Sequence, residues 1–445
     1  MLKAMVTAFK IPDLRRKILF TLAMLVVFRL ISHIPVPLIN AQFVGKIVEQ
    51  NAILGMLDLF SGGALVEFSV AAMGVYPYIT ASIVMQLLVP IIPALERLSK
   101  EGEMGQQKIN RWTYWLTIPL AGLQAYGQVT LLARSSAAGS PILRIDKFTL
   151  FDPHYILPTL TILSSMIAGT MVLIWIGDLI TEQGVGNGLS IIIFGGIVSR
   201  LPTMVGRLAQ GGGQSAMGWV GVGLFLVIAL LTIVAIVLVQ EGKRELRVQY
   251  SRRVRGTKLY GGGSTTLPLR VNMAGMIPLI FAQSFLLLPG QIASYLAPAS
   301  GVAPRTWVQR VAQWVVTYFS TTHALYWVLL FILVVFFTYF YTIIVFSQTN
   351  IAENLKKSGG FIPGYRPGEQ TERLLTAIVN RITLVGALFL GVVAVLPFIV
   401  QKVSGLQGQG LQLSATALLI VVGVAVDTMK QLEAQLLIRR YEGFL

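Results

Sequence analysis

The sequence predicts an all-α, polytopic membrane protein with ten transmembrane helices and one short helix that does not span the membrane. Of its 445 residues, 55% are hydrophobic and only 12% are charged. In ordinary soluble domains, about a quarter of the residues are charged. Ten mostly apolar stretches also reach about 20 residues, the length that a helix needs to cross a bilayer. These predicted spans are 18–37, 70–93, 112–133, 155–177, 189–208, 218–240, 272–297, 323–347, 379–400 and 413–435.

The loops between these spans alternate in charge, which predicts their orientation. Most of the 35 Lys and Arg residues fall on the side that contains both termini and the long loops 241–271 and 349–378. Positively charged loops are retained on the cytoplasmic side, so we expect both termini in the cytoplasm. The first span carries Arg29 and is not followed by a small-residue cleavage site. It therefore predicts a retained anchor rather than a signal peptide.

The segment 51–68 between the first two spans is apolar, yet it is too short and too rich in glycine to cross a bilayer. At membrane depth, irregular backbone is tolerated only where protein buries it or where it lines an aqueous cavity. The segment therefore predicts a cavity among the helices and is a first indication of a pore.

Loop 241–271 alternates basic and apolar residues, which predicts a small hairpin that projects from the membrane. A basic hairpin can dock an acidic surface or an RNA backbone, or it can contact lipid headgroups. The sequence alone leaves these alternatives open. The basic residues that alternate with apolar ones are Lys243, Arg244, Arg247, Arg252, Arg253, Arg255 and Lys258, and Arg270 lies at the end of the loop.

The stretch 356–371 combines several glycines with Pro363 and Pro367. These residues fix an extended, turn-rich loop that displays Arg366 between rigid turns. We interpret the loop as a docking site for a partner, with a structured connector as the alternative.

Motifs of membrane enzymes are missing from the sequence. The 3 histidines form no paired-histidine zinc motif, and no glycine-flanked serine or Walker A lysine is present. With 0 cysteines, neither a thiolate nucleophile nor a cysteine-ligated metal is available. The glycines of 184–188 predict a tight turn in which Asn187 caps the next helix. We expect no catalytic residue, no metal site and no cofactor.

An ion-coupled transporter is the main alternative to a channel, and it would place acidic residues near the membrane midplane. In this chain, Asp178, Glu182 and Asp427 lie at span ends, and only Arg29 lies deep, where we expect it to reach for the interface. The large basic loops and the shortage of midplane acids favour the channel.

Six motifs that run nearly from end to end give the chain a resemblance to the SecY family, the central subunits of the bacterial Sec protein-conducting channel. The motifs follow the family's order and topology. They are Phe60–Leu65, Pro77–Ile83, Lys100–Glu103, Gly184–Ser190, Val271–Pro278 and Lys356–Thr371.

The resemblance implies two inverted five-helix halves, 1–208 and 209–445, that are hinged like a clamshell. It also implies a lateral gate, formed by the second and third spans against the seventh and eighth. A short plug helix at about 55–68 would close the outer vestibule. Its implied site residues are Leu57, Leu59, Phe60, Ser61, Gly62, Gly63, Ala64 and Leu65.

A constriction ring of aliphatic side chains is implied between the halves. Such a collar dewets and resists ions, yet it has no polar group that would hold a passing peptide. Apolar segments leave sideways into lipid, because the bilayer favours leucine-like residues and disfavours charges. By resemblance the ring consists of Val75, Ile79, Leu189, Ile193, Ile280 and Ile420, with Val75 and Leu189 in place of the more usual isoleucine.

The implied function is to move unfolded polypeptides across the bacterial plasma membrane and to release apolar segments into it. The implied partners are the SecE and SecG subunits, the SecA motor ATPase, the ribosome, signal peptides, nascent polypeptides and membrane lipid, with no specific DNA binding. Gly256, Thr257 and Lys258 stand where the family usually has a glycine followed by two basic residues, so this chain has one basic residue fewer at that place. The implied docking residues are Arg252, Arg253, Arg255, Lys258, Lys356, Lys357, Arg366 and Glu369.

Overall fold

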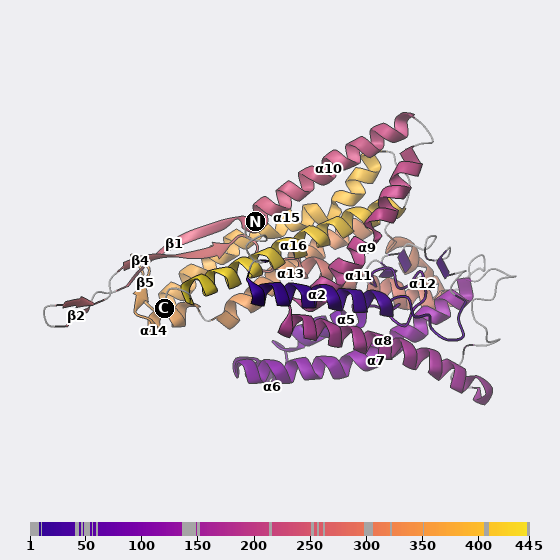
Figure 1. Cartoon of the computed structure of the whole chain (residues 1–445), viewed down its shortest axis with the longest axis horizontal. Coiled ribbons are helices and arrows are strands. Elements are labelled where there is room, and N and C mark those ends of the chain that lie inside the picture. The colour runs from indigo at the N-terminus through magenta and orange to yellow at the C-terminus, as the bar shows by residue number, and fades with distance from the viewer. Residues whose placement is uncertain are drawn as a thin grey trace.

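Long helices packed side by side make up most of the molecule, and a β-hairpin extends from one end of them (Figure 1). The computed structural model describes residues 9, 11–40, 44–45, 48, 54–55, 57–58, 61–135, 148, 152–212, 216–250, 253–255, 258–260, 263–297, 306–320, 323–349, 351–404 and 409–442.

Each of the ten predicted spans overlaps a helix, although the first helix ends at Ile31 and not at residue 37 as predicted. Three shorter helices, α6 (Pro93–Lys100), α12 (Trp307–Tyr318) and α14 (Ile351–Lys357), lie in the connections. The ten longer helices are α2 (Pro12–Ile31), α5 (Tyr76–Leu88), α7 (Glu103–Ser135), α8 (Pro153–Gln183), α9 (Gly188–Gly212), α10 (Ala216–Glu241), α11 (Ile277–Leu296), α13 (Ala324–Thr349), α15 (Glu369–Ser404) and α16 (Gln409–Glu442).

By length and apolar composition alone, four helices of the described part qualify as membrane spans: α8, α11, α13 and α15. Helices α5 and α6 together form a fifth, broken candidate, with a bend of 103° between them. The apolar stretches of α9 and α10 are shorter, at Gly188–Arg200 and Leu226–Glu241.

Proline marks the start of several helices. It occupies one of the first two positions of α2, α5, α6, α8 and α11. The missing N–H has no intrahelical partner there, and the fixed φ suits the helix. At α9, the backbone N–H of Ser190 donates to Asn187 Oδ1 at 3.2 Å, which confirms the predicted cap.

The second span begins later than predicted. The prediction starts it at residue 70, whereas α5 starts at Tyr76, after turns that run through residues 61–75. Gly74 has a φ of +56°, a left-handed value that a helix cannot contain. The prediction of a helix through 70–75 is therefore wrong.

The plug helix predicted at 55–68 is also shorter than expected. Residues 54–55 and 57–58 are helical, but residues 61–68 form turns. Gly62 and Gly63 have φ values of +68° and +94°, and even Phe68 has a φ of +42°. These left-handed residues end the helix.

The hairpin predicted in loop 241–271 is confirmed. Strand β1 (Lys243–Tyr250) pairs antiparallel with β4 (Gly263–Arg270), and β2 (Arg253–Arg255) pairs with β3 (Lys258–Tyr260) nearer the tip. The short strand β5 (Gly360–Phe361) from the second long loop adds to β1, so that the sheet order is β4-β1-β5. One sheet thus joins the two loops.

An apolar cluster supports this sheet. Val248 of β1 and Leu269 of β4 pack with Ile362, Leu355 of α14 and Leu375 of α15. We call the strands β1, β4 and β5, together with this cluster, the sheet platform.

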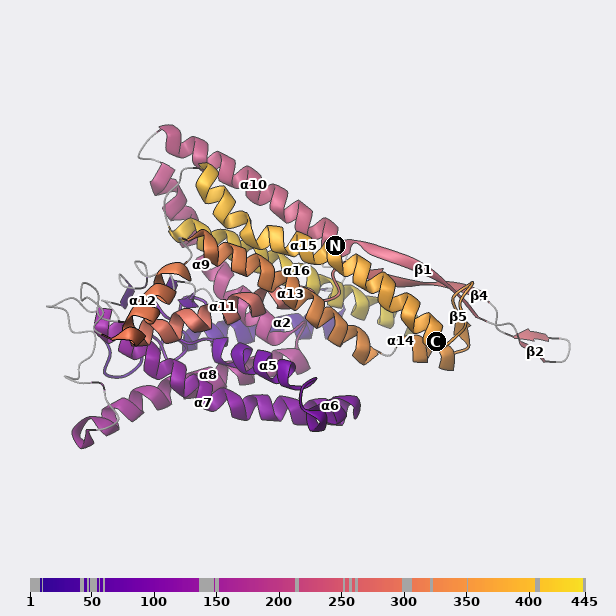
Figure 2. The ribbon, with the colours of Figure 1, turned by 180° about the vertical axis from the view of Figure 1, so that it is seen from behind.

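The molecule has two distinct ends. Both views show the sheet platform at one end and α12 at the other (Figures 1 and 2). Leu14 near the start of α2 packs with Leu432 near the end of α16 and with Val185 in the turn before α9. The first and last described helices therefore meet at one place.

Candidate functional site

The plug segment, residues 55–68, lies in the main apolar core. Leu57, Ala64 and Leu65 are buried there, and Ser61 and Gly62 are buried beside them. The segment is thus housed by protein, as its composition predicts. The predicted plug residues Leu59 and Phe60 lie outside the described residues.

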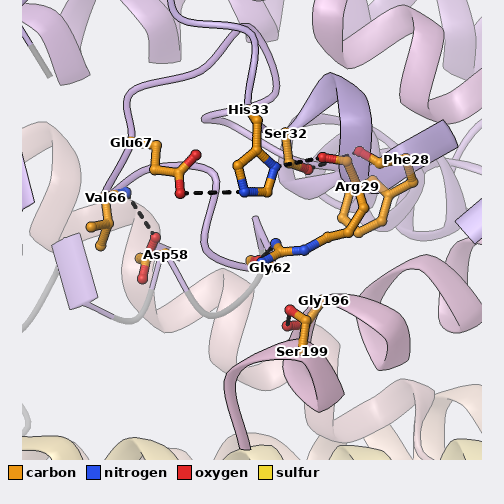
Figure 3. A network of polar contacts seen from close by, with 10 residues as sticks. All are labelled: Phe28, Arg29, Ser32, His33, Asp58, Gly62, Val66, Glu67, Gly196 and Ser199. Carbon is orange, nitrogen blue, oxygen red and sulfur yellow. Dashed lines mark hydrogen bonds and ion pairs between the residues drawn. The ribbon is translucent and has the colours of Figure 1, made fainter. Parts of the chain in front are cut away.

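Two helices contact the plug segment at Gly62 (Figure 3). The Nη1 atom of Arg29, on α2, donates to the carbonyl oxygen of Gly62 at 3.0 Å. On the other side, a Cβ added to Gly62 would lie 2.6 Å from Cα of Gly196 on α9. Arg29 therefore binds the plug segment. At Gly62 only glycine allows this close approach.

A buried ion pair also ties the segment to α9. The carboxylate of Asp58 binds Nη1 of Arg200, and its Oδ1 accepts from the backbone N–H of Val66 at 3.1 Å. The Arg200 side chain crosses Gly63, where an added Cβ would lie 2.5 Å from Nε. Sequence reasoning missed this pair. The signal was Asp58 in the otherwise apolar run 52–66, because a carboxylate that is buried as a charge needs a cationic partner.

A histidine lies beside this network at the end of α2. His33 Nδ1 donates to the Arg29 carbonyl at 2.7 Å, and Nε2 lies 3.5 Å from Oε1 of Glu67. Both side chains are about half exposed, at 52% and 48%. Among the described residues, no group of three or more His, Asp or Glu could hold a metal ion.

The six predicted ring residues come from four helices that share the main core. Five of them are buried and Leu189 is half-buried, and all six belong to the same apolar cluster as the plug residues Leu57, Ala64 and Leu65. Their role as a constriction stays a prediction. The ring residues are Val75 and Ile79 at α5, Leu189 and Ile193 on α9, Ile280 on α11, and Ile420 on α16.

The predicted lateral gate coincides with a seam in which α11 contacts both α5 and α7. The hydroxyl of Tyr76 donates to the carbonyl of Ser284 at 3.1 Å across this seam. The ring of Tyr295, on α11, packs directly against Gly127 of α7, where no Cβ would fit.

Polar side chains are also buried near this seam, and sequence reasoning missed them. Gln124 of α7 and Gln283 of α11 are 6% and 1% exposed. Within the described part of the chain, neither polar atom of the Gln124 side chain has a hydrogen-bond partner, nor has Oε1 of Gln283.

The sheet platform and the hairpin carry the predicted docking residues. Three of them lie in the paired strands β2 and β3, and Arg252 lies outside the described residues. Lys357 forms an ion pair with Glu353 at 3.0 Å, and Glu369 forms one with Arg373 at 2.7 Å. The residues in β2 and β3 are Arg253, Arg255 and Lys258, and the exposed residues of the second loop are Lys356, Lys357, Arg366 and Glu369.

The turns predicted around Arg366 are confirmed. Gly364 and Gly368 have φ values of +87° and +110°, which only glycine adopts readily. The Thr371 hydroxyl donates to the Arg366 carbonyl at 2.8 Å, and the Arg366 N–H donates to Gln370 Oε1 at 3.4 Å. The backbone is fixed on both sides of Arg366 while its side chain stays exposed.

Comparison with known proteins agrees with this arrangement. A sequence model of the SecY family matches residues 69–429. The protein translocase subunit SecY of Thermotoga maritima is 42% identical over 453 residues, which cover 100% of this chain and 98% of that protein.

Two solved structures share the fold, each with a TM-score of 0.61 and with 96% of both chains covered. One, 17% identical, is a SecY protein whose plug domain is described as stabilising the closed state of the translocation channel and maintaining a membrane seal. The other, 16% identical, is Sec61 in the canine ribosome–channel complex from the endoplasmic reticulum. With a family match over most of the chain and a relative at 42% identity over all of it, this chain belongs to the SecY family of protein translocase subunits, with an all-α, polytopic membrane fold.

Proposed function

We propose that this chain forms the pore of a translocase in the bacterial plasma membrane, with both termini and the sheet platform on the cytoplasmic side. The observation that carries the proposal is the plug segment. It is an apolar segment that does not span, and it is buried between α2 and α9. The pore lies between the halves 1–208 and 209–445.

At rest, the plug segment and the ring seal the pore together. The six ring side chains are aliphatic, so a constriction made of them dewets and stops ions without binding a passing chain. The plug segment adds a second barrier on the outer side. Two barriers in series explain how a channel wide enough for a polypeptide can remain tight.

Sideways release uses the seam between α11 and the pair α5 and α7. The Tyr76–Ser284 hydrogen bond and the Tyr295–Gly127 contact close this seam. An apolar segment in the pore gains free energy by moving into lipid, whereas a charged one loses it. The bilayer therefore does the sorting, and the protein supplies the opening.

The driving force comes from partners, because the chain is a channel subunit and not an enzyme. The sheet platform and the hairpin present basic side chains that attract an acidic protein surface or ribosomal RNA. We expect the SecA motor ATPase and the ribosome to dock here, and the SecE and SecG subunits to complete the complex.

Reconstitution tests this function. Proteoliposomes that contain this chain with SecE, SecG and SecA should take up a preprotein that carries a signal peptide when ATP is added. Uptake is measured as protection of the preprotein from external protease. If no condition gives protection, the proposal is wrong.

The docking role is tested by Arg366→Glu. We expect ATP-driven uptake to fall about tenfold, since a charge that steers partner binding is reversed. The control is Arg310→Glu, which makes the same charge change on α12 at the other end of the molecule and should leave uptake unchanged. Equal uptake by the two variants would count against docking at Arg366.

A further inference from the structure

Asp58 of the plug segment has a buried side chain that is only 2% exposed. Its carboxylate forms an ion pair with Arg200 of α9, whose side chain is 26% exposed. We propose that this ion pair is a latch that holds the plug segment closed, and that the plug segment cannot leave its site until the pair separates. The inference rests on the proposed role of the segment as a plug.

The two charges depend on each other only while the plug segment is in place. A buried carboxylate without a partner is strongly unfavourable, so Asp58 needs Arg200 in the closed state. Outside its site, Asp58 would be hydrated, and Arg200 is already in partial contact with solvent. The pair therefore favours closure without making the closed state irreversible.

The fit beside the latch makes closure all-or-none. Gly62 lies against Gly196 so closely that a Cβ on either residue would collide with the Cα of the other. Arg29 of α2 also donates to the Gly62 carbonyl (Figure 3). A small outward displacement would lengthen all of these contacts at once. The latch thus acts on a segment that is either fully in place or released.

The other end of the plug segment is a hinge. The Val36 N–H donates to the Phe68 carbonyl at 3.0 Å, and the Val70 N–H donates to the Ile34 carbonyl at 2.9 Å. These main-chain bonds do not involve the latch, so they persist when it breaks. The segment then pivots about residues 68–70, and Asp58 moves farther than the residues beside the hinge.

Hydrogen bonds within the segment let it move as one body. The Ser61 hydroxyl and the Gly63 N–H both donate to the Asp58 carbonyl at 3.0 Å, and the Val66 N–H donates to the Asp58 carboxylate. When the ion pair and the contacts at Gly62 break together, Asp58, Ser61, Gly63 and Val66 therefore move as one unit.

Ion leakage through the reconstituted complex with SecE and SecG tests the latch. Arg200→Gln leaves the buried Asp58 carboxylate without its cationic partner. We expect ion leakage in planar bilayers to rise at least about tenfold. Asp58→Asn should have a smaller effect, because the amide oxygen of the new side chain can still accept from the Val66 N–H and because Arg200 is partly solvated. The double variant should leak less than Arg200→Gln alone, since no charge is stranded.

Two controls separate the latch from the plug. Glu67→Gln neutralises another acid of the same segment, but one that is 48% exposed, and it should leave leakage unchanged. Deletion of residues 55–65 should raise leakage if the segment is a plug at all. If the deletion leaks and Arg200→Gln does not, the latch is wrong and the plug stands. If the deletion does not leak, the plug itself is wrong.

A second readout follows movement directly. The chain has 0 cysteines, so Ser61→Cys introduces a unique thiol at a site that is 1% exposed. Alkylation by a reagent that cannot cross the membrane, added from the outer side, should be at least about tenfold faster with Arg200→Gln than without it. Arg200→Lys keeps the charge and should stay near the unmodified rate. Equal rates with Arg200 and with Arg200→Gln would overturn the latch.

Discussion

The plug segment and the sheet platform are held by different sets of contacts. Besides the apolar packing of Leu57, Ala64 and Leu65, the plug segment depends on one buried ion pair, one arginine at a carbonyl and one glycine against a glycine. In the sheet platform, β1 pairs with β4 from Lys243↔Arg270 to Tyr250↔Gly263, over a supporting apolar cluster.

The difference matches what each region must do in the proposed mechanism. A few strong contacts that break together give a segment with two states, which suits a plug. Many contacts of moderate strength keep their arrangement under load, which suits a surface where a motor or a ribosome pushes. Single substitutions should therefore act on leakage at the plug segment and on driven transport at the platform.

The largest effect on stability is expected at the platform core. Leu375→Ala truncates a side chain that is 0% exposed in the cluster under the sheet. Such cavities cost about 2–5 kcal/mol. We expect the loop 349–378 to become sensitive to protease and ATP-driven uptake to fall, while ion leakage stays unchanged.

The control for this substitution is Leu384→Ala on the same helix, α15. That side chain is 48% exposed, so it loses little packing. It should resist protease like the unmodified chain. Equal sensitivity of the two variants would show that the cluster does not hold the platform.

The next largest effect is expected when two glycines with similar left-handed φ angles are each replaced by alanine. Gly62 has a φ of +68° and touches Gly196, whereas Gly364 has a φ of +87° and nothing within 4 Å of an added Cβ. Alanine in the left-handed region costs about 1–2 kcal/mol at either site. Only Gly62→Ala adds a collision, so it should raise leakage.

Gly364→Ala should leave leakage unchanged and disturb only the turn that precedes Arg366. Conductance in planar bilayers measures the contrast. If both variants leak equally, backbone strain rather than the contact with Gly196 is responsible, and the proposed site of the plug segment is wrong.

Local patterns in the sequence were enough to predict the spans, the hairpin and the turns around Arg366. Each of these depends on residues that are near neighbours in the chain, such as Asn187 capping the helix that follows it. The pairing of β5 with β1 was not predictable, because the register Tyr250↔Gly360 joins two loops distant in sequence. Glycine suits position 360, because the Cβ of a larger residue would lie only 3.1 Å from the Tyr250 ring and would crowd it.

The plug segment shows the same limit. Its apolar character predicted burial, and the resemblance supplied its place, but neither could supply the partner of Asp58. Arg29 and Arg200 both lie on the helices beside it, and only the folded structure shows which one binds the carboxylate and which one binds the Gly62 carbonyl. Distant polar pairing is decided by the geometry of the packed helices.

The smallest effect is expected at the surface of the platform. Glu353→Gln removes an ion pair with Lys357 in which the side chains are 60% and 70% exposed. Such pairs contribute about 0–1 kcal/mol, so thermal stability should not change measurably. The substitution does, however, free a positive charge at the proposed docking surface. We expect SecA to bind a few-fold more tightly at low salt and equally at high salt, because exposed charges are screened. Tighter binding that persists at high salt would mean that the loop has changed shape, and that the platform is less rigid than its sheet and its cluster indicate.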